Sequence, residues 1–255
     1  MWMGKRVVRG YFCNFVTLLP DGGGGTGFLN NVQLTAWIMK ERDMTGIKNI
    51  IFDLGGVLIN LERQRCIEAF EQVGMDKVVH YVKEGKVQDL FYDSEIGNTN
   101  TQEFCDEVRH LTQSNIANDD IVWAWNQLLG EISDEKKECL LLLKKKYRLF
   151  LLSNTNEMHW NHCLKEKLND KGLGVNDYFE RVFLSYVMHQ LKPSASIFEQ
   201  VLQEAHLKAE ETLFVDDSLA NCEGARSVGI KAWHEKTGEE WMEKIISSDP
   251  LLSLL

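Results

Sequence analysis

The chain has 255 residues, of which 44% are hydrophobic and 26% charged, and its formal net charge is −10 at pH 7. These values are typical of a soluble globular protein with one domain and a modest insert. Lysine and arginine are scattered among the acids, which argues against binding to nucleic acid or to an anionic membrane, because both need clustered positive charge.

The lengths of the apolar runs and the spacing of the cysteines exclude further classes of protein. No run approaches the ~20 continuous apolar residues of a membrane-spanning helix. The 6 cysteines show no CxxC spacing, which excludes the familiar zinc ribbons and disulfide scaffolds and predicts a reducing, cytoplasmic location. A small anionic substrate is compatible with the negative net charge, because a pocket needs only one or two cations of its own.

Residues 1–46 differ in composition from the rest of the chain. They contain an interrupted apolar run over 11–19 and then four consecutive glycines over 22–25. A secretory signal is the alternative interpretation, but polar residues break the apolar run and no clean small-x-small cleavage site follows. Because a glycine run loses much backbone entropy on ordering, we expect a disordered N-terminal extension, with the natural start at Met39 or Met44.

From residue 47 onward, strand and helix patterns alternate. Residues 47–52 form an apolar, β-branched run typical of a buried parallel strand, which ends at Asp53 and a Gly-Gly turn. Amphipathic spacing then predicts helices over 63–73, 78–91, 101–112 and 119–130. A second alternating block predicts, in order, helix 134–146, strand 147–152, strand 181–184, helix 194–205, strand 212–215, helix 219–228 and strand 230–233.

This order of elements predicts an α/β fold, with a Rossmann-like parallel sheet as its core and an inserted all-helical cap domain. The expected domains are the extension over 1–46, an α/β catalytic core over 47–61 and 134–255, and a helical cap over 62–133. Open α/β sheets bind ligands beyond the carboxyl ends of their strands, so the residues after each strand matter most.

Polar and charged residues follow four of the predicted strands, one of them after a loop: Asp53, Ser153, Asn154, Lys192, Asp216, Asp217 and Asn221. Three carboxylates at one edge repel one another, which favours a hard divalent cation such as Mg²⁺. The hydroxyl, amide and ammonium groups can then bind a phosphate, and Asp53 becomes an in-line nucleophile. Each signal also has a structural explanation as a turn, a helix cap or a solvated lysine, so the functional interpretation depends on all four occurring in order.

The motifs IIFDLGGVL, LLSNTN, LKP and FVDDSLAN together resemble the four ordered motifs of the haloacid dehalogenase (HAD) superfamily of hydrolases. The resemblance covers about 47–235 and is greatest to the capped phosphatase branch, including sugar-1-phosphate phosphatases. It implies a Mg²⁺-dependent phosphohydrolase of small phosphorylated metabolites that works through an aspartyl-phosphate. The resemblance implies that Asp53 is the nucleophile and that Lys192 is also catalytic. It implies four metal ligands, Asp53, Gly55, Asp216 and Asp217, with Asn221 as a support for them. It also implies three phosphate-binding residues, Ser153, Asn154 and Lys192.

The chain departs from that family pattern at Gly55, where most of the phosphatase branch carries a second Asp that acts as general acid and base. The carbonyl of Gly55 can still ligate Mg²⁺, but the missing carboxyl removes a proton donor worth ~10²–10⁴-fold in rate. Two interpretations stay open: an enzyme that prefers good leaving groups, or a catalytically silent relative that binds a phosphometabolite or a protein partner. In the cap, Trp125 and Asn126 are candidate substrate-binding residues, because a sugar ring can stack on an indole and hydrogen-bond to an amide.

Overall fold

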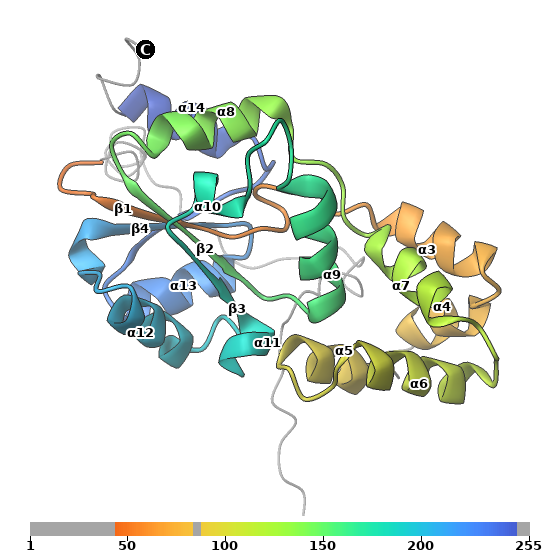
Figure 1. Cartoon of the computed structure of the whole chain (residues 1–255). Coiled ribbons are helices and arrows are strands. Elements are labelled where there is room, and N and C mark those ends of the chain that lie inside the picture. The colour runs from red at the N-terminus through yellow and green to blue at the C-terminus, as the bar shows by residue number, and fades with distance from the viewer. Residues whose placement is uncertain (1–43, 84–87, 249–255) are drawn as a thin grey trace, which may run out of the picture.

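The computed structural model describes residues 44–83 and 88–248, which form a parallel sheet covered by helices and a group of helices at one end (Figure 1). Within these residues, five strands pair in the order β3-β2-β1-β4-β5, and every pairing is parallel. The expected α/β fold with a Rossmann-like parallel sheet is confirmed. The strands are β1 (Asn49–Phe52), β2 (Arg148–Ser153), β3 (Arg181–Leu184), β4 (Thr212–Asp216) and β5 (Lys231–His234).

Both faces of the sheet are covered, which explains why its central strands are apolar without alternation. Along β1, Ile50 and Phe52 join the core on one face, while Ile51 joins the core on the other. The first face is covered by α8 (Asp134–Leu143), α10 (Val175–Tyr178) and α14 (Glu240–Ser248), and the second by α12 (Ala195–Glu204) and α13 (Leu219–Ser227) (Figure 1).

The helices between β1 and α8, which we call the cap, have a hydrophobic core of their own that includes Phe91, Phe104 and Trp125. The helix expected over 78–91 corresponds to two helices, α4 (Asp76–Lys83) and α5 (Gln88–Glu95), and residues 84–87 lie outside the described part. The cap helices are α3 (Arg63–Gln72), α4 (Asp76–Lys83), α5 (Gln88–Glu95), α6 (Thr101–Thr112) and α7 (Asn118–Asn126).

Two short core helices, which the sequence pattern did not predict, face the cap in Figure 1. They are α9 (Glu157–His162), followed by a π-helical turn over Cys163–Lys167, and α11 (Ser185–Met188). A 3₁₀ turn over Ala209–Glu211 precedes β4. In the part of the chain that the structure describes, no helix is both long and apolar enough to cross a membrane.

The folded part of the chain already includes Met44. Its side chain is 7% exposed in the main core, and its carbonyl oxygen accepts the Ile47 N–H at 3.1 Å. The expected extension over 1–46 is therefore too long at its end, because the last of these residues pack with the domain. Residues 1–43, which carry the rest of that expectation, lie outside the described residues.

Candidate active site

The strand order creates a switch point at β1, which pairs with β2 on one side and β4 on the other. Ligands bind at such points in doubly wound sheets, just beyond the carboxyl ends of the strands. Phe52 lies opposite Val215, so the next residues, Asp53 and Asp216, leave the sheet side by side. Ser153 is the last residue of β2 on the other flank of β1. The parallel register thus gathers three of the expected site residues at one edge.

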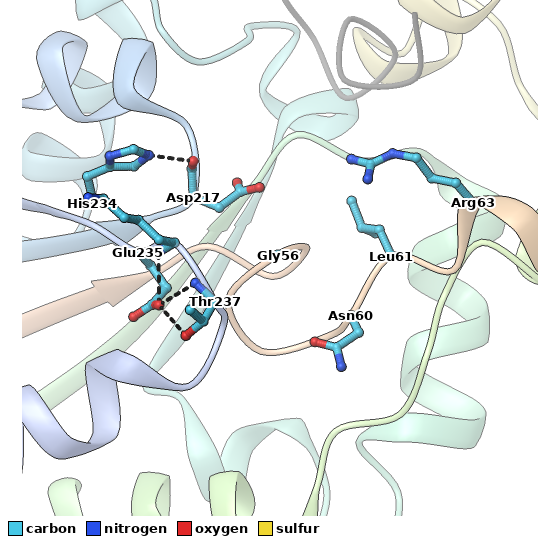
Figure 2. A pocket seen from close by; sticks show the side chains of 9 residues that line it. Gly56, Asn60, Leu61, Arg63, Asp217, His234, Glu235 and Thr237 are labelled. Atoms are coloured by element: carbon cyan, nitrogen blue, oxygen red, sulfur yellow. Dashed lines mark hydrogen bonds between the residues drawn. The ribbon is translucent and has the colours of Figure 1, made fainter. Parts of the chain in front are cut away.

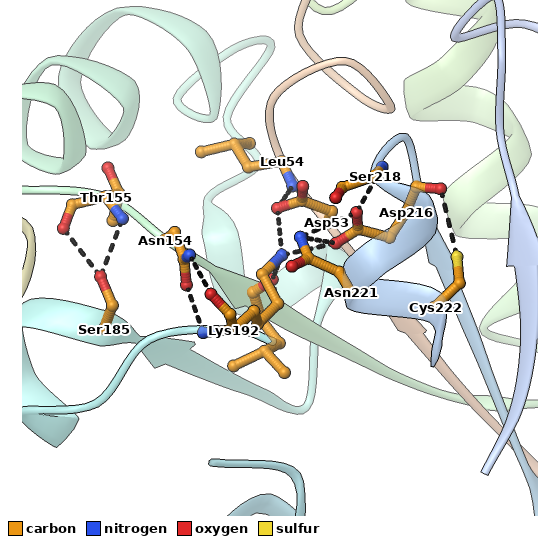
Figure 3. Close-up of polar contacts among 11 residues, drawn as sticks. Asp53, Leu54, Asn154, Thr155, Ser185, Lys192, Asp216, Ser218, Asn221 and Cys222 are labelled. Carbon is orange, nitrogen blue, oxygen red and sulfur yellow. Dashed lines mark hydrogen bonds and ion pairs between the residues drawn. The ribbon is translucent and has the colours of Figure 1, made fainter. Parts of the chain in front are cut away.

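Lys192 is the positive centre of this edge, and Figure 3 shows it between the two carboxylates. Its Nζ lies 2.8 Å from Asp53 Oδ1 and 2.7 Å from Asp216 Oδ2, with none of its side chain exposed. The ammonium also donates to the carbonyl oxygen of Leu152 at 2.9 Å. Burial alone would lower the pKa of Lys192, but the charges of Asp216 and Asp53 raise it above its ordinary value. The lysine is therefore held in its charged form.

Asp53 is buried, and its Oδ1 also accepts the Leu54 N–H at 2.7 Å. Burial raises the pKa of Asp53 well above its usual range, the nearby charge of Lys192 opposes this, and Asp216 and Asp217 add to it. Asp53, Asp216 and Asp217 each offer a carboxylate oxygen, and these atoms all lie within 4.8 Å of one another. The site therefore concentrates more negative charge than one lysine balances.

Asp216 is saturated by donors from the protein. Its Oδ1 accepts from the Ser218 N–H at 2.8 Å and from Asn221 Nδ2 at 3.0 Å, and its Oδ2 accepts from Asn221 at 3.1 Å in addition to Lys192. Two carboxylate oxygens provide about four acceptor positions, so all are occupied. In this arrangement Asp216 anchors Lys192, and its role as a metal ligand stays a prediction. Asn221 lies where it was expected, in contact with this carboxylate.

Asp217 turns the other way, toward the Gly-Gly turn after β1 (Figure 2). A Cβ built on Gly56, whose φ is +73°, would overlap the Asp217 carboxylate, so only glycine permits this approach. Burial and the charge of Asp216 together raise the pKa of Asp217 to about 6, although the charges of Lys192 and Arg63 oppose this rise. The backbone of Asp217 is fixed because His234 Nε2 donates to its carbonyl oxygen at 2.9 Å. Asp217 is thus the second carboxylate that faces the site.

Ser153 and Asn154 have different roles although they are adjacent. The Ser153 hydroxyl is fully buried and has no hydrogen-bond partner among the described residues. The Asn154 side chain instead makes two hydrogen bonds to the backbone of Lys192. Its Oδ1 accepts the Lys192 N–H at 2.9 Å, and its Nδ2 donates to the Lys192 carbonyl oxygen at 3.0 Å. The expectation that the Asn154 side chain binds phosphate is corrected, because both its oxygen and its amino group already hold the lysine loop.

The structure places Trp125 in the interior of the cap. It is 4% exposed and lies 4.7 Å from the ring of Phe91 and 4.8 Å from that of His159, measured between ring centroids. Stacking of a sugar on Trp125 is therefore not supported, because protein side chains cover its ring. Asn126 is also buried, and its Oδ1 has no hydrogen-bond partner among the described residues.

A cavity of ≈390 Å³ opens beside Asp217, between the loop after β5 and the entry to the cap (Figure 2). Sequence reasoning singled out Asp217 and the Gly-Gly turn, but it missed the other residues of this cavity because they belong to no strand-end motif of the predicted site. Arg63 and Lys236 bring positive charge to this cavity, and Asp217 and Glu235 bring negative charge, so its lining is polar and of mixed charge. The cavity is lined by Gly56, Asn60, Leu61, Arg63, Asp217, His234, Glu235, Lys236 and Thr237.

A parallel sheet with a buried carboxylate, a paired lysine and a cluster of three carboxylates at its switch point is typical of an α/β enzyme, here with a helical cap. The comparisons agree with this class. The family model of haloacid dehalogenase-like hydrolases matches residues 47–229. The chain therefore belongs to the haloacid dehalogenase-like hydrolase family, which confirms the resemblance seen in its motifs.

Curated relatives of this chain are phosphatases. D-ribitol-5-phosphate phosphatase of Bacteroides thetaiotaomicron is 28% identical over 199 residues, which cover 78% of this chain and 97% of the relative. Sesquiterpene phosphatase astK of Aspergillus oryzae is 24% identical over 199 residues, covering 74% of this chain and 90% of the relative.

Solved structures give the same result. An HAD family enzyme of Bacteroides thetaiotaomicron, in complex with magnesium and inorganic phosphate, is 39% identical with a TM-score of 0.73, covering 76% of this chain and 97% of that one. An HAD-like family hydrolase of Porphyromonas gingivalis is 33% identical with a TM-score of 0.72, covering 80% of this chain and 98% of that one. The expectation of a hydrolytic enzyme is confirmed.

Proposed function

We propose that this protein is a Mg²⁺-dependent phosphohydrolase of small phosphorylated metabolites, of the sugar phosphate type, that works through an aspartyl-phosphate on Asp53. The observation that carries the proposal is the group formed by Asp53, Lys192 and Ser153 at one edge of the sheet. It combines a carboxylate, a buried cation 2.8 Å from it and a buried hydroxyl without a partner. The phosphatase relatives support the same reaction class.

The donor set at this edge fits Mg²⁺, which prefers a few carboxylates together with substrate oxygens and waters. With Asp216 saturated by Lys192 and its other donors, the carboxylates of Asp53 and Asp217 and the carbonyl of Gly55 would hold the ion. The glycine at position 56 preserves room for the Asp217 carboxylate. When bound, the ion neutralises these carboxylates and the charge on the transferring phosphate.

The side chains at this edge bind the phosphate and supply the nucleophile. The Ser153 hydroxyl and the Lys192 ammonium donate to phosphate oxygens, which orients the phosphorus toward Asp53. Lys192 and the Leu54 N–H occupy Asp53 Oδ1, which leaves Oδ2 as the attacking atom. Oδ2 bonds to phosphorus as the bond to the leaving oxygen breaks. Water then attacks the phosphorus, and the Asp53 carboxylate is regenerated as inorganic phosphate leaves.

The cysteines bear on the cellular location of the protein, and the cavity beside Asp217 bears on the organic part of its substrate. The five described cysteines are buried free thiols, and burial raises the pKa of Cys66 to about 12, which fits a reducing cytoplasm. A sugar-like substrate fits the polar lining of the cavity beside Asp217, which carries both cationic and carboxylate groups. Asn126, with its unpartnered Oδ1, stays a candidate for a substrate hydroxyl.

The test is a panel of phosphorylated metabolites assayed with Mg²⁺ and after treatment with a chelator. We expect phosphate release only with the metal, and we expect Asp53→Asn to abolish it without changing the circular dichroism spectrum. Asp106→Asn, which alters an exposed carboxylate of the cap, is the matched control and should stay active. Full turnover in chelator, or Asp53→Asn activity within about tenfold of the parent, would refute the mechanism. Phosphate binding without any turnover would favour the silent relative.

A further inference from the structure

The turn that follows β1 carries the carbonyl of Gly55, which the proposed function assigns to the metal. Inside the turn, the Gly56 N–H donates to the carbonyl oxygen of Ile59 at 2.8 Å. The N–H groups of Leu58 and Ile59 donate to the carbonyl oxygen of Leu54 at 2.9 and 2.8 Å. These bonds set the shape of the turn, and contacts from outside set its position on the core.

Lys136 of α8 makes such a contact. Its side chain is 2% exposed, and its Nζ donates to the carbonyl oxygens of Val57 and Leu58 at 3.0 and 3.3 Å. The same Nζ lies 3.2 Å from Glu239 Oε1. An ammonium group has three N–H donors, and these three acceptors match them. Lys136 therefore joins the turn, α8 and the loop after β5 through one atom.

The loop after β5 (residues 235–239) contacts the turn a second time, at Gly238. A Cβ on Gly238, whose φ is +80°, would lie 3.2 Å from the carbonyl oxygen of Gly56, so the two backbones meet closely. Glu235 holds the loop in shape, because its Oε1 accepts the N–H groups of the next three residues at 2.9 to 3.1 Å (Figure 2). The turn thus packs against a loop whose backbone is fixed by a buried carboxylate.

The same loop is fixed to the other side of the proposed metal site. The Glu235 N–H donates to the carbonyl oxygen of Asp216 at 2.9 Å. His234, the last residue of β5, donates from Nε2 to the carbonyl oxygen of Asp217 at 2.9 Å. The Asp217 carboxylate in turn occupies the place where a Cβ of Gly56 would lie. The turn and Asp217 therefore share one support, and a shift of the turn changes its distance from the carboxylate.

We propose that Lys136 is a positioning residue for Mg²⁺, because it holds the turn after β1 at the distance from Asp217 that the ion needs. This inference rests on the proposed function, in which the Gly55 carbonyl and the Asp217 carboxylate both hold the metal. Mg²⁺ demands near-octahedral geometry with ligands at about 2.0–2.1 Å, whereas Ca²⁺ accepts irregular sites with ligands at about 2.3–2.6 Å. Displacement of the turn should therefore weaken the binding of Mg²⁺ more than that of Ca²⁺.

The sign of the effect separates the position of the turn from the charge of the lysine. Lys136 is a cation, so its removal leaves the site more negative, and Coulomb attraction alone would make Mg²⁺ bind more tightly. Loss of the hydrogen bonds to the Val57 and Leu58 carbonyls acts in the opposite direction, because it releases the turn. A weaker affinity after removal of a positive charge is thus the result that a positioning role predicts.

The experiment measures the Kd of Mg²⁺ and of Ca²⁺ by isothermal titration calorimetry on the full chain without substrate. We expect Lys136→Met to raise the Mg²⁺ Kd by about tenfold or more and the Ca²⁺ Kd by less than about threefold. Lys137→Met is the matched control, because it removes the same charge from the same helix, but its partner is Asp170, at 3.2 Å. The control should change neither Kd by more than about threefold.

A second pair of variants disturbs the turn from the loop and keeps every charge. Gly238→Ala places a methyl group 3.2 Å from the Gly56 carbonyl oxygen, whereas Gly172→Ala, at a φ of +79° against +80°, has open space around it. Gly238→Ala should also raise the Mg²⁺ Kd more than the Ca²⁺ Kd, and Gly172→Ala should change neither. If circular dichroism shows that Lys136→Met does not fold, this pair decides the outcome.

Two outcomes would overturn the proposal. An unchanged or lower Mg²⁺ Kd in Lys136→Met, with the parent binding the ion, would show that the lysine only stabilises the fold. Equal weakening of Mg²⁺ and Ca²⁺ binding would show a general loosening of the site instead of a displaced ligand. Failure of the parent to bind Mg²⁺, or to hydrolyse any ester of the panel with the ion bound, would instead refute the proposed function, which separates the two failures.

Discussion

Replacing Lys192 by methionine removes the cation that holds the edge of the sheet together and keeps a side chain of similar length. The lysine bonds to Asp53 at 2.8 Å and to Asp216 at 2.7 Å, and the two carboxylate side chains are 4% and 0% exposed. Water cannot take over the role of the missing ammonium in such a buried site. The variant therefore has two buried carboxylates without their common partner.

The size of the effect follows from this burial. Removing one partner of a buried ion pair costs about 3–5 kcal/mol, and here a single lysine serves two carboxylates. We expect Lys192→Met to lose about 5 kcal/mol of the free energy of unfolding near pH 7.5 without metal. The loss should shrink toward acid pH. Asp53 already has a raised pKa in the folded protein, and without the lysine that pKa rises further. The unfolded state is common to both proteins, so the penalty grows as the pH rises above the folded pKa of Asp53 in the parent.

The measurement is urea unfolding in chelator at about pH 5 and about pH 7.5. Lys136→Met is the matched control, because Lys136 is also 2% exposed but donates to the Val57 and Leu58 carbonyls at 3.0 and 3.3 Å. Its carboxylate partner, Glu239, is 55% exposed and can be hydrated. The control should lose stability by a similar amount at both pH values. A Lys192→Met loss below about 1 kcal/mol, or one that does not change with pH, would refute the reasoning.

Two further predictions concern the metal ligand and the contact between cap and core. Gly56→Ala should raise the Mg²⁺ concentration for half-maximal activity by at least about tenfold, because its methyl group overlaps the Asp217 carboxylate, whereas Gly74→Ala, at a φ of +76° with open space around it, should not. An unchanged metal titration for Gly56→Ala would contradict this. His159→Phe should remove about 2–3 kcal/mol of acid sensitivity in urea unfolding between about pH 6.5 and 4, because burial lowers the pKa of His159 to about 4 and only the unfolded chain takes up its proton in that window. Parallel pH curves for the parent and His159→Phe would show that another group titrates there.

The central residues of the site could be predicted from the sequence because they lie next to strand patterns that are visible in a few consecutive residues. Asp53, Ser153 and Asp216 each end or follow a short apolar run, and a parallel sheet brings the ends of such runs to one edge. The register that sets Phe52 opposite Val215 then places Asp53 beside Asp216. Ser153 ends β2 in the same way, as the last residue of its strand.

The division of roles within each motif could not be predicted, because it depends on contacts between loops. Adjacent residues after a strand point in different directions, and whether Asp216 or Asp217 meets the lysine is decided by the loop that follows β3. The same loop takes the Asn154 side chain, which holds Lys192 through two hydrogen bonds of 2.9 and 3.0 Å. The motifs contain both residues of the pairs Ser153-Asn154 and Asp216-Asp217. Only the tertiary contacts show which residue of each pair holds Lys192 or its loop.

The sequence also could not predict which side chains of the cap helices are buried and which are exposed. Trp123 and Trp125 have the same chemistry and lie two residues apart in α7, yet they are 42% and 4% exposed. Which of them is buried depends on α9, because His159 stacks on Trp125 with its ring tilted by 22°. The sequence pattern did not predict α9, so it could not assign the two indoles to their faces.

Gly55 is a position at which the local motif alone indicates a lost acid. The tertiary structure adds a contact between cap and core that the motif does not contain: Ser185 Oγ donates to the backbone carbonyl of Glu95, which joins residues 90 positions apart and ties the end of α5 to α11. A substrate that prevents α5 from meeting α11 would therefore lose its enclosure. Discrimination against it would lower kcat, and not only raise KM, because the penalty falls on the transition state.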